Sequence, residues 1–379
     1  MELMLTRRRL AVVLLAFVVS LALAQAAPRL LAADFPATLT DREFWSLTQT
    51  LSEPDGSFRS DNFLSNERGY QLIIPDLLER ITPGAGVYLG VGPEQNFAYI
   101  AALRPRAAFI IDVRRGNLHE HLLYKALFEM SATRADFLGR LFSRKRPAGL
   151  SADSTAAQLF SAYDGVQQSE ALYQENVKAV IDWLTKRHGF ALSASDVRGI
   201  EYVYHDAFFV AGPNLDYSLG GGGGGGGNAP TYRELMLATD GVGQNRGYLT
   251  SEESFGYVKN LETRNLLVPV VGNFAGPKAI RAVGQYIKDH GGMVVAFYLS
   301  NVEQYLAQDG IWGNFCSNVA TLPLDDASMY IYSGRGGPNA VARGLPTRFG
   351  SGGGGGGGLQ TTIRPIRRDL VLCSSVQTR

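Results

Sequence analysis

Short apolar runs alternate with amphipathic segments between residues 81 and 130. Residues 86–91 (GVYLGV) and 107–112 (AAFIID) are continuous apolar runs with the length of buried strands. Residues 94–104 and 117–130, which follow them, repeat apolar side chains at helical spacing. Strand, helix, strand and helix joined by short links predict a parallel sheet with right-handed crossovers.

The same alternation is predicted again in the second half of the chain. Residues 199–214 (GIEYVYHDAFFVAGPN) are rich in residues that favour strands, and we expect the third strand there. The fourth and fifth strands are expected at 266–274 and 293–301, and closing strands at 318–324 and 328–333. Helical patterns occupy residues 231–240, 251–265, 276–291 and 302–315.

The remaining segments carry helical or loop patterns and set the expected domain limits. Residues 131–195 contain two helical patterns without a clear strand, which predicts a helical insertion in an α/β domain spanning 81–335. Residues 27–80 form a helical N-terminal extension, in which Thr40 and Glu43 make a capping-box pattern. Residues 336–379 are expected to be a glycine-rich loop and C-terminal tail. The glycine tracts at 220–227 and 351–358 have no side chains to bury, so no chemistry is assigned to them.

Residues 1–26 have the pattern of a secretory signal peptide. Arg7 to Arg9 precede an apolar run from Leu10 to Ala24, and Ala24-Gln25-Ala26 is a small-x-small cleavage signal. An uncleaved anchor formed by residues 10–27 is the alternative. Either reading predicts an exported chain, periplasmic or extracellular, with membrane contact only through an uncleaved N-terminal segment.

Charge and cysteine content narrow the possible partners. The net charge is +1, so nothing in the composition favours a nucleic-acid partner. The two cysteines, Cys316 and Cys373, are free to pair after export, or to remain separate thiols in or near the core. No Walker loop, G-x-S-x-G elbow or H-E-x-x-H metal motif occurs.

The loop after the first predicted strand is the main candidate for a ligand site. Gly90 and Gly92 end the apolar run, and Glu94 stands where the next helix begins. A glycine turn between strand and helix is typical of nucleotide sites, and it is also an ordinary turn. Asp112 lies twenty residues beyond Gly92, at the spacing of an acid that holds ribose hydroxyls. A helix N-cap is the alternative role for Asp112.

Roughly residues 60–130 and 196–335 resemble the class I S-adenosylmethionine (SAM)-dependent methyltransferase superfamily, on the basis of Gly90, Gly92 and Asp112. The resemblance implies an α/β fold: a Rossmann-like, methyltransferase-type sheet with helices on both faces. It implies SAM as cofactor, bound by these three residues, with Asp206 against the adenine. Two departures are an acid missing before the loop, where Tyr88 or Leu89 stands, and Glu94 or a neighbour in place of a third glycine.

Glu94 bears on which ligand the loop accepts. A carboxylate at a helix N-terminus is favourable for the helix, and it would repel a pyrophosphate. It would accept the amino group or the sulfonium charge of a cationic ligand. Glu94 is therefore included in the expected SAM site, and it argues against a dinucleotide.

Asn273 and His205 are the candidate catalytic residues. The resemblance places Asn273 where the family carries an (Asp/Asn)-Pro-Pro-aromatic motif, although the prolines are missing and turn formation is the alternative. His205 and Asp206 form either an acid/base pair or a cap at a strand end. His119 and His121 lie two apart on a helix and therefore face different sides, so no metal site is expected there.

Two functions remain open. The first is transfer of a methyl group from SAM to an unknown small-molecule or protein acceptor. The second is a non-catalytic exported binding or scaffolding protein that has lost its cofactor. Export weighs against the enzyme, because SAM is a cytoplasmic metabolite. Residues 66–68 (Asn-Glu-Arg) either fold over the cofactor site or begin a charged helix.

Overall fold

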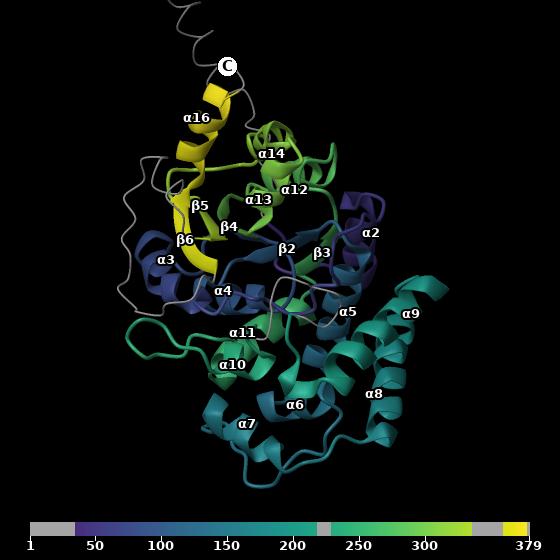
Figure 1. Ribbon diagram of the computed structural model, residues 1–379. Helices are drawn as coiled ribbons and strands as arrows, with labels where there is room; N and C mark the ends of the chain where they lie inside the picture. Colours follow the sequence, from purple (N-terminus) through teal and green to yellow (C-terminus); the bar gives the residue numbers. More distant parts are fainter. Residues whose placement is uncertain (1–34, 218–228, 336–358, 377–379) are drawn as a thin grey trace, which may run out of the picture.

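The computed structural model describes residues 35–217, 229–335 and 359–376, and its centre is a six-stranded sheet of order β3-β2-β1-β4-β5-β6 (Figure 1). Neighbouring strands from β3 to β5 are parallel, and β6 is antiparallel to β5. The strands are β1 Val87–Gly90, β2 Ala107–Asp112, β3 Leu267–Val271, β4 Val294–Ser300, β5 Met329–Arg335 and β6 Leu359–Pro365. The predicted α/β class is confirmed.

Helices cover both faces of the sheet. Helix α5 packs on β2 and β3 with α11 beside it, while α12 packs on β2 from the other side and contacts α14 (Figure 1). Every residue of β1, β2 and β3 is buried, which explains their continuous apolar runs. The helices outside the insertion are α2 Asp41–Leu51, α3 Ile74–Arg80, α4 Gln95–Leu103, α5 Arg115–Met130, α11 Glu252–Thr263, α12 Ala279–Asp289, α13 Val302–Gln308, α14 Trp312–Val319 and α16 Ile366–Val376.

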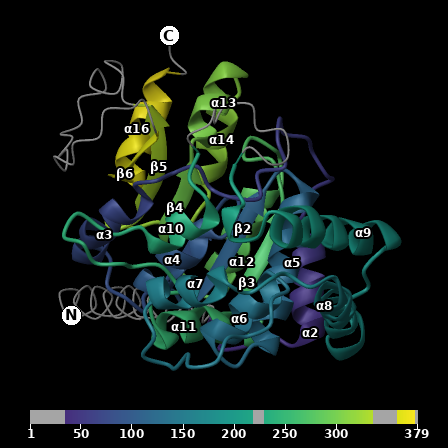
Figure 2. The ribbon, with the colours of Figure 1, turned by 60° about the horizontal axis from the view of Figure 1, so that its bottom comes forward.

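A large helical segment separates α5 from α11. It comprises α6 Arg134–Leu141, α7 Ala156–Asp164, α8 Glu170–Asp182, α9 Ala194–Tyr202 and α10 Tyr232–Leu237. Both views place α8 and α9 at the opposite end of the molecule from β6 and α16 (Figures 1 and 2). The capping box predicted at Thr40 and Glu43 begins α2 as expected.

The predicted third strand at 199–214 is wrong. These residues continue α9 into a π-helical segment, Val203–Val210, and β3 forms instead from the run predicted as the fourth strand. Phe208 and Phe209 pack edge-on and face-on against Tyr124 and Tyr173. A buried aromatic run between helices has the same composition as a buried strand, and tertiary packing decides between them.

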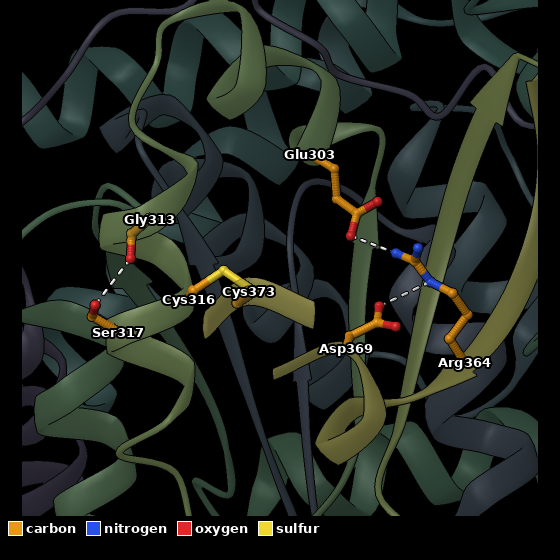
Figure 3. Close-up of a disulfide and its surroundings, with 7 residues drawn as sticks. All are labelled: Glu303, Gly313, Cys316, Ser317, Arg364, Asp369 and Cys373. Carbon is orange, nitrogen blue, oxygen red and sulfur yellow. Dashed lines mark hydrogen bonds and ion pairs between the residues drawn. A yellow bond between two sulfur atoms is a disulfide. The ribbon is translucent and has the colours of Figure 1, made fainter. Parts of the chain in front are cut away.

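The C-terminal region also differs from the prediction. Part of the segment expected to be a tail forms β6 and α16. Residues 318–324, expected to be a strand, form the end of α14 and a turn. The helix expected at 302–315 is divided into α13 and α14 at Gly310, which has a φ of 70°. A disulfide joins Cys316 of α14 to Cys373 of α16 (Figure 3). Arg364 of β6 makes ion pairs with Glu303 and Asp369 beside it.

The proposed signal peptide and both glycine tracts lie outside the described residues. Within the described ranges, no helix is long and apolar enough to cross a membrane.

Candidate functional site

A cavity of about 470 Å³ lies at the carboxyl ends of the central strands. Its walls include Gly92 after β1, Asp112 at the end of β2, Asn273 after β3 and Ser300 at the end of β4. Strand order reverses here, because β2 lies on one side of β1 and β4 on the other. Open α/β sheets bind ligands at such a point. Three predicted site residues, Gly92, Asp112 and Asn273, thus line one cavity.

Gly90 is required by packing rather than by a ligand. A Cβ on Gly90 would lie 1.9 Å from Oδ1 of Asn96. The Asn96 amide donates to the carbonyls of residues 91–93 at 2.7–3.2 Å, and its Oδ1 accepts from the Tyr88 hydroxyl at 2.9 Å. Asn96 therefore holds the loop in shape, and Gly90 makes room for it.

Gly92 fits the expected role better than Gly90, because a ligand in the cavity can approach its backbone. Its φ is 76°, a conformation that favours glycine, and it lines the cavity. Among the described atoms, the nearest to a Cβ built there is the Asn62 amide at 3.9 Å. The carbonyl of Gly92 is held from behind by Nε2 of His121 at 2.9 Å. The loop therefore presents a fixed backbone surface to the cavity.

Asp112 is buried and already bonded to Arg114. Its Oδ1 accepts from the backbone N–H and the Nε of Arg114 at 2.9 and 3.0 Å, and its Oδ2 accepts from Nη2 at 2.8 Å. The N-cap of α5 is Arg114, so Asp112 stabilises the turn before the helix rather than serving as its N-cap. A carboxylate has about four acceptor positions, so Oδ2 keeps one for a further donor.

Glu94 is fully buried beneath the loop and does not line the cavity. Neither carboxylate oxygen makes a hydrogen bond of good geometry among the described residues. Burial raises the pKa of Glu94 to about 8, and the nearby backbone N–H groups of Glu94 and Ser65 oppose this only in part. Burial also raises the pKa of Glu120 well above its ordinary value, with Glu94 adding to the effect. Glu94 is therefore mostly protonated at neutral pH and presents no fixed charge to a ligand.

Burial also shifts the pKa of His121, which is next to Glu120 in the sequence, but it lowers this pKa, to about 4. The neutral ring must carry its proton on Nε2, because Nε2 faces a carbonyl oxygen. His119, two residues earlier, instead contacts Asp196 at 2.9 Å, so the two histidines serve different partners. Among the described residues, no cluster of three His, Cys, Asp or Glu side chains suits a metal ion.

We predict that Glu94→Gln flattens the pH dependence of stability. The folded pKa of about 8 exceeds the ordinary 4.5, so the unfolding free energy of the natural protein falls as pH rises through this range. One proton is worth about 1.4 kcal/mol per pH unit. Between about pH 6 and pH 7.5, the unfolding free energy of the natural protein should therefore fall by about 2 kcal/mol more than that of the variant. Urea unfolding at both pH values measures this difference. The exposed Glu79→Gln is the control, and equal pH dependence of all three proteins would contradict the burial of an unpaired Glu94.

His205 and Asp206 are not brought to the cavity. They lie on the π-helical segment, where both side chains are 45% exposed and His205 Nδ1 lies 3.6 Å from Asp206 Oδ2. Their predicted position depended on a third strand that does not form, so no described contact links them to a cofactor site. His205 instead packs against Tyr173 and Phe209.

Asn273 lies on the cavity rim, exposed to solvent. It follows β3, which is third in the chain rather than fourth. Its Oδ1 accepts from the backbone N–H of Ala275 at 2.9 Å, which is ordinary turn chemistry, and its own N–H donates to Glu53 at 3.0 Å. The side-chain amide nitrogen is the group left to meet a ligand.

The segment 57–66 covers the cavity, and of this segment the sequence indicated only Asn66 as a possible part of the site. Phe58 packs edge-on against Tyr305 at 5.0 Å between ring centres, and Arg59 lies 5.5 Å over the same ring. Leu306 and Ile311 also line the cavity, so this part of its lining is mostly apolar, whereas the strand ends are polar. A cavity with aromatic and polar lining suits a ligand with a flat apolar part and several polar atoms.

Glu67 is the buried centre of a second missed group. Its Oε1 accepts from the hydroxyls of Tyr298 at 3.0 Å and Ser300 at 2.5 Å. Its Oε2 accepts from the Gln95 amide at 2.7 Å and from the Thr361 hydroxyl at 3.5 Å. The sequence predicted that residues 66–68 either fold over the site or begin a charged helix; no helix begins there, and Asn66 lines the cavity. Contacts of Glu67 with residues more than two hundred positions away could not be read from that pattern.

Comparison with known proteins yields one family match. Residues 62–342 match a family described as a domain of unknown function (DUF7790). This range includes the cavity residues after each of the four strands. No curated protein matches the chain.

Proposed function

The chain belongs to the DUF7790 family, and we propose that it binds SAM in the cavity and transfers its methyl group to an acceptor. The observation that carries the proposal is the pairing of Gly92 and Asp112 at adjacent strand ends, where the sheet order reverses. A cavity of about 470 Å³ lies in the usual range for small-molecule sites. When bound, the cofactor supplies a methyl group on a positively charged sulfur.

The residues present fit such a ligand. Gly92 leaves open space toward the cavity, as a close backbone approach requires. Asp112 keeps one acceptor position on Oδ2 for a ribose hydroxyl while Arg114 stays bonded. Val113 and Phe274 offer apolar surface at the ends of β2 and β3 for a flat base. Asn273 stands on the rim, where an acceptor would enter.

The methyltransferase-type sheet and export are parts of the same proposal. The disulfide between Cys316 and Cys373 supports export, because such bonds persist in oxidising compartments. Export through residues 1–26 and the use of a cytoplasmic cofactor are compatible when the protein acquires the cofactor before it leaves the cytoplasm.

A non-catalytic exported binding or scaffolding protein is the second candidate. The observation that favours it is the engagement of Asp112 by three hydrogen bonds from Arg114. A buried ion pair of this kind maintains a turn without any ligand. In that case the cavity is a remnant, and its occupant has no reaction to undergo.

Asp112→Asn separates the two candidates. If Asp112 holds a ribose hydroxyl, the change should weaken S-adenosylhomocysteine binding about 10- to 100-fold, because a charged acceptor is lost. Calorimetric titration measures the affinity, and adenine, which lacks the ribose, should bind the variant and the natural protein equally. Asp326→Asn, at a carboxylate whose side chain is 93% exposed, is the matched control. Equal affinity of the natural protein and Asp112→Asn for S-adenosylhomocysteine would contradict the ribose contact.

A further inference from the structure

Ser300 closes the cavity wall at the carboxyl end of β4. It is only partly exposed, lines the cavity and has a φ of 50°, which is uncommon for a residue other than glycine. The pairing of β4 with β5 shifts register between Tyr298 and Ser300. The hydroxyls of Tyr298 and Ser300 thereby both reach Oε1 of the buried Glu67.

Glu67 determines the hydrogen-bonding character of this wall. Four side-chain donors surround its two oxygens, with the Thr361 hydroxyl the most distant at 3.5 Å. These donors occupy most of the acceptor positions of the carboxylate. The Ser300 hydroxyl must direct its hydrogen at Glu67, since a carboxylate oxygen cannot donate in return.

A hydroxyl that has already donated can only accept. Ser300 lines the cavity, so its hydroxyl is available there as an acceptor and has no hydrogen left to donate. Burial, followed by the charge of Glu67 among other causes, raises the pKa of Tyr298 well above its ordinary value, so its phenol also remains a donor to Glu67. A ligand group that meets the Ser300 hydroxyl must therefore carry N–H or O–H.

We propose that Ser300, oriented by Glu67, binds the protonated amino group of the S-adenosyl ligand; this rests on the proposed function. An ammonium has only donors, and the negative charge of Glu67 lies one hydrogen bond behind Ser300. The acid expected before the glycine loop is absent from the sequence, and Glu94 does not line the cavity. Glu67, which directly follows the segment 57–66, supplies the missing negative charge through the Ser300 hydroxyl at the end of β4.

The geometry of the cavity agrees with this assignment. Asp112 lies on the β2 side of the glycine loop and Ser300 on the β4 side, so a ligand crossing Gly92 spans both. Among the described lining residues, Asp309 is the one acidic side chain beyond β4, and it is exposed at the rim. It is the competing partner for the amino group and is tested alongside Ser300.

The test compares two ligands on the purified protein. Calorimetric titration uses S-adenosylhomocysteine and its analogue with hydrogen in place of the amino group. The natural protein should prefer the amino compound by about tenfold or more, as expected for a hydrogen bond to a charged group. Ser300→Ala and Glu67→Gln should each bring this ratio close to one. Ser317→Ala, at an exposed serine on α14, is the matched control and should keep the ratio (Figure 3).

Adenosine, which lacks the amino-acid tail, checks that the variants fold. Its affinity should be unchanged in Ser300→Ala. If S-adenosylhomocysteine binds but the ratio survives in Ser300→Ala, or is lost only in Asp309→Asn, the inference is overturned and the proposed function stands. If neither adenosyl compound binds the natural protein, both are overturned.

Discussion

Arg134→Met is expected to lower the unfolding free energy by about 3–5 kcal/mol, because it removes the buried partner of a half-buried ion pair and the donor to three carbonyl groups. The Arg134 side chain is 1% exposed and pairs with Glu252 at 3.0 Å. Its guanidinium also donates to the carbonyls of Leu249, Ala152 and Ser154, each at 2.8 Å. Methionine keeps most of the volume but leaves these acceptors without a donor.

Arg146→Met is the matched control for this prediction. Arg146 pairs with Asp136 at 2.8 Å, but its side chain is 43% exposed, so its loss should cost less than about 1 kcal/mol. Urea unfolding followed by circular dichroism compares the two variants. Equal stability of both would mean that Arg134 does not hold the helical segment onto the start of α11.

Loss of the disulfide should have an effect of similar size. Cys316 and Cys373 are 57 residues apart, and a crosslink over a loop of that length stabilises by about 4 kcal/mol in the chain-entropy account. The bond ties α16 to α14, whose preceding residue Ile311 lines the cavity. The double variant with serine at both positions, and the natural protein in reductant, should therefore unfold at clearly lower urea concentrations.

The double serine variant also provides the internal control. Reductant should have no effect on it, since it has no bond to break. Thiol titration of the denatured natural protein without reductant should find no free cysteine. Two free thiols, or a natural protein whose unfolding is insensitive to reductant, would contradict the crosslink.

The strands predicted correctly from the sequence are those with apolar neighbours on both faces of the sheet. Residues 86–91 and 107–112 read as buried strands because helices cover the sheet, and β1 and β2 form there. The run at 199–214 has the same composition for a different reason, since its aromatic rings pack between helices. The overlooked signal was Ser193 with Asp196, a capping box that begins α9.

The sequence could predict those cavity residues whose positions are determined by the ends of strands. Gly92, Asp112 and Asn273 follow three predicted strands, and parallel strands bring their carboxyl ends to one edge. Ser300 and Glu67 were not predictable in the same way. Their contact joins residues 233 apart, and only the fold shows that a charged side chain near the N-terminus is buried against β4.

Equilibrium dialysis of the purified natural protein against SAM tests the central claim most directly. Saturable binding at one site, displaced by S-adenosylhomocysteine and weakened by Asp112→Asn, is the result predicted by a cofactor cavity at the reversal of the sheet. No binding of either compound at millimolar concentration would contradict it, and the Gly92 loop would then be a turn in a scaffold.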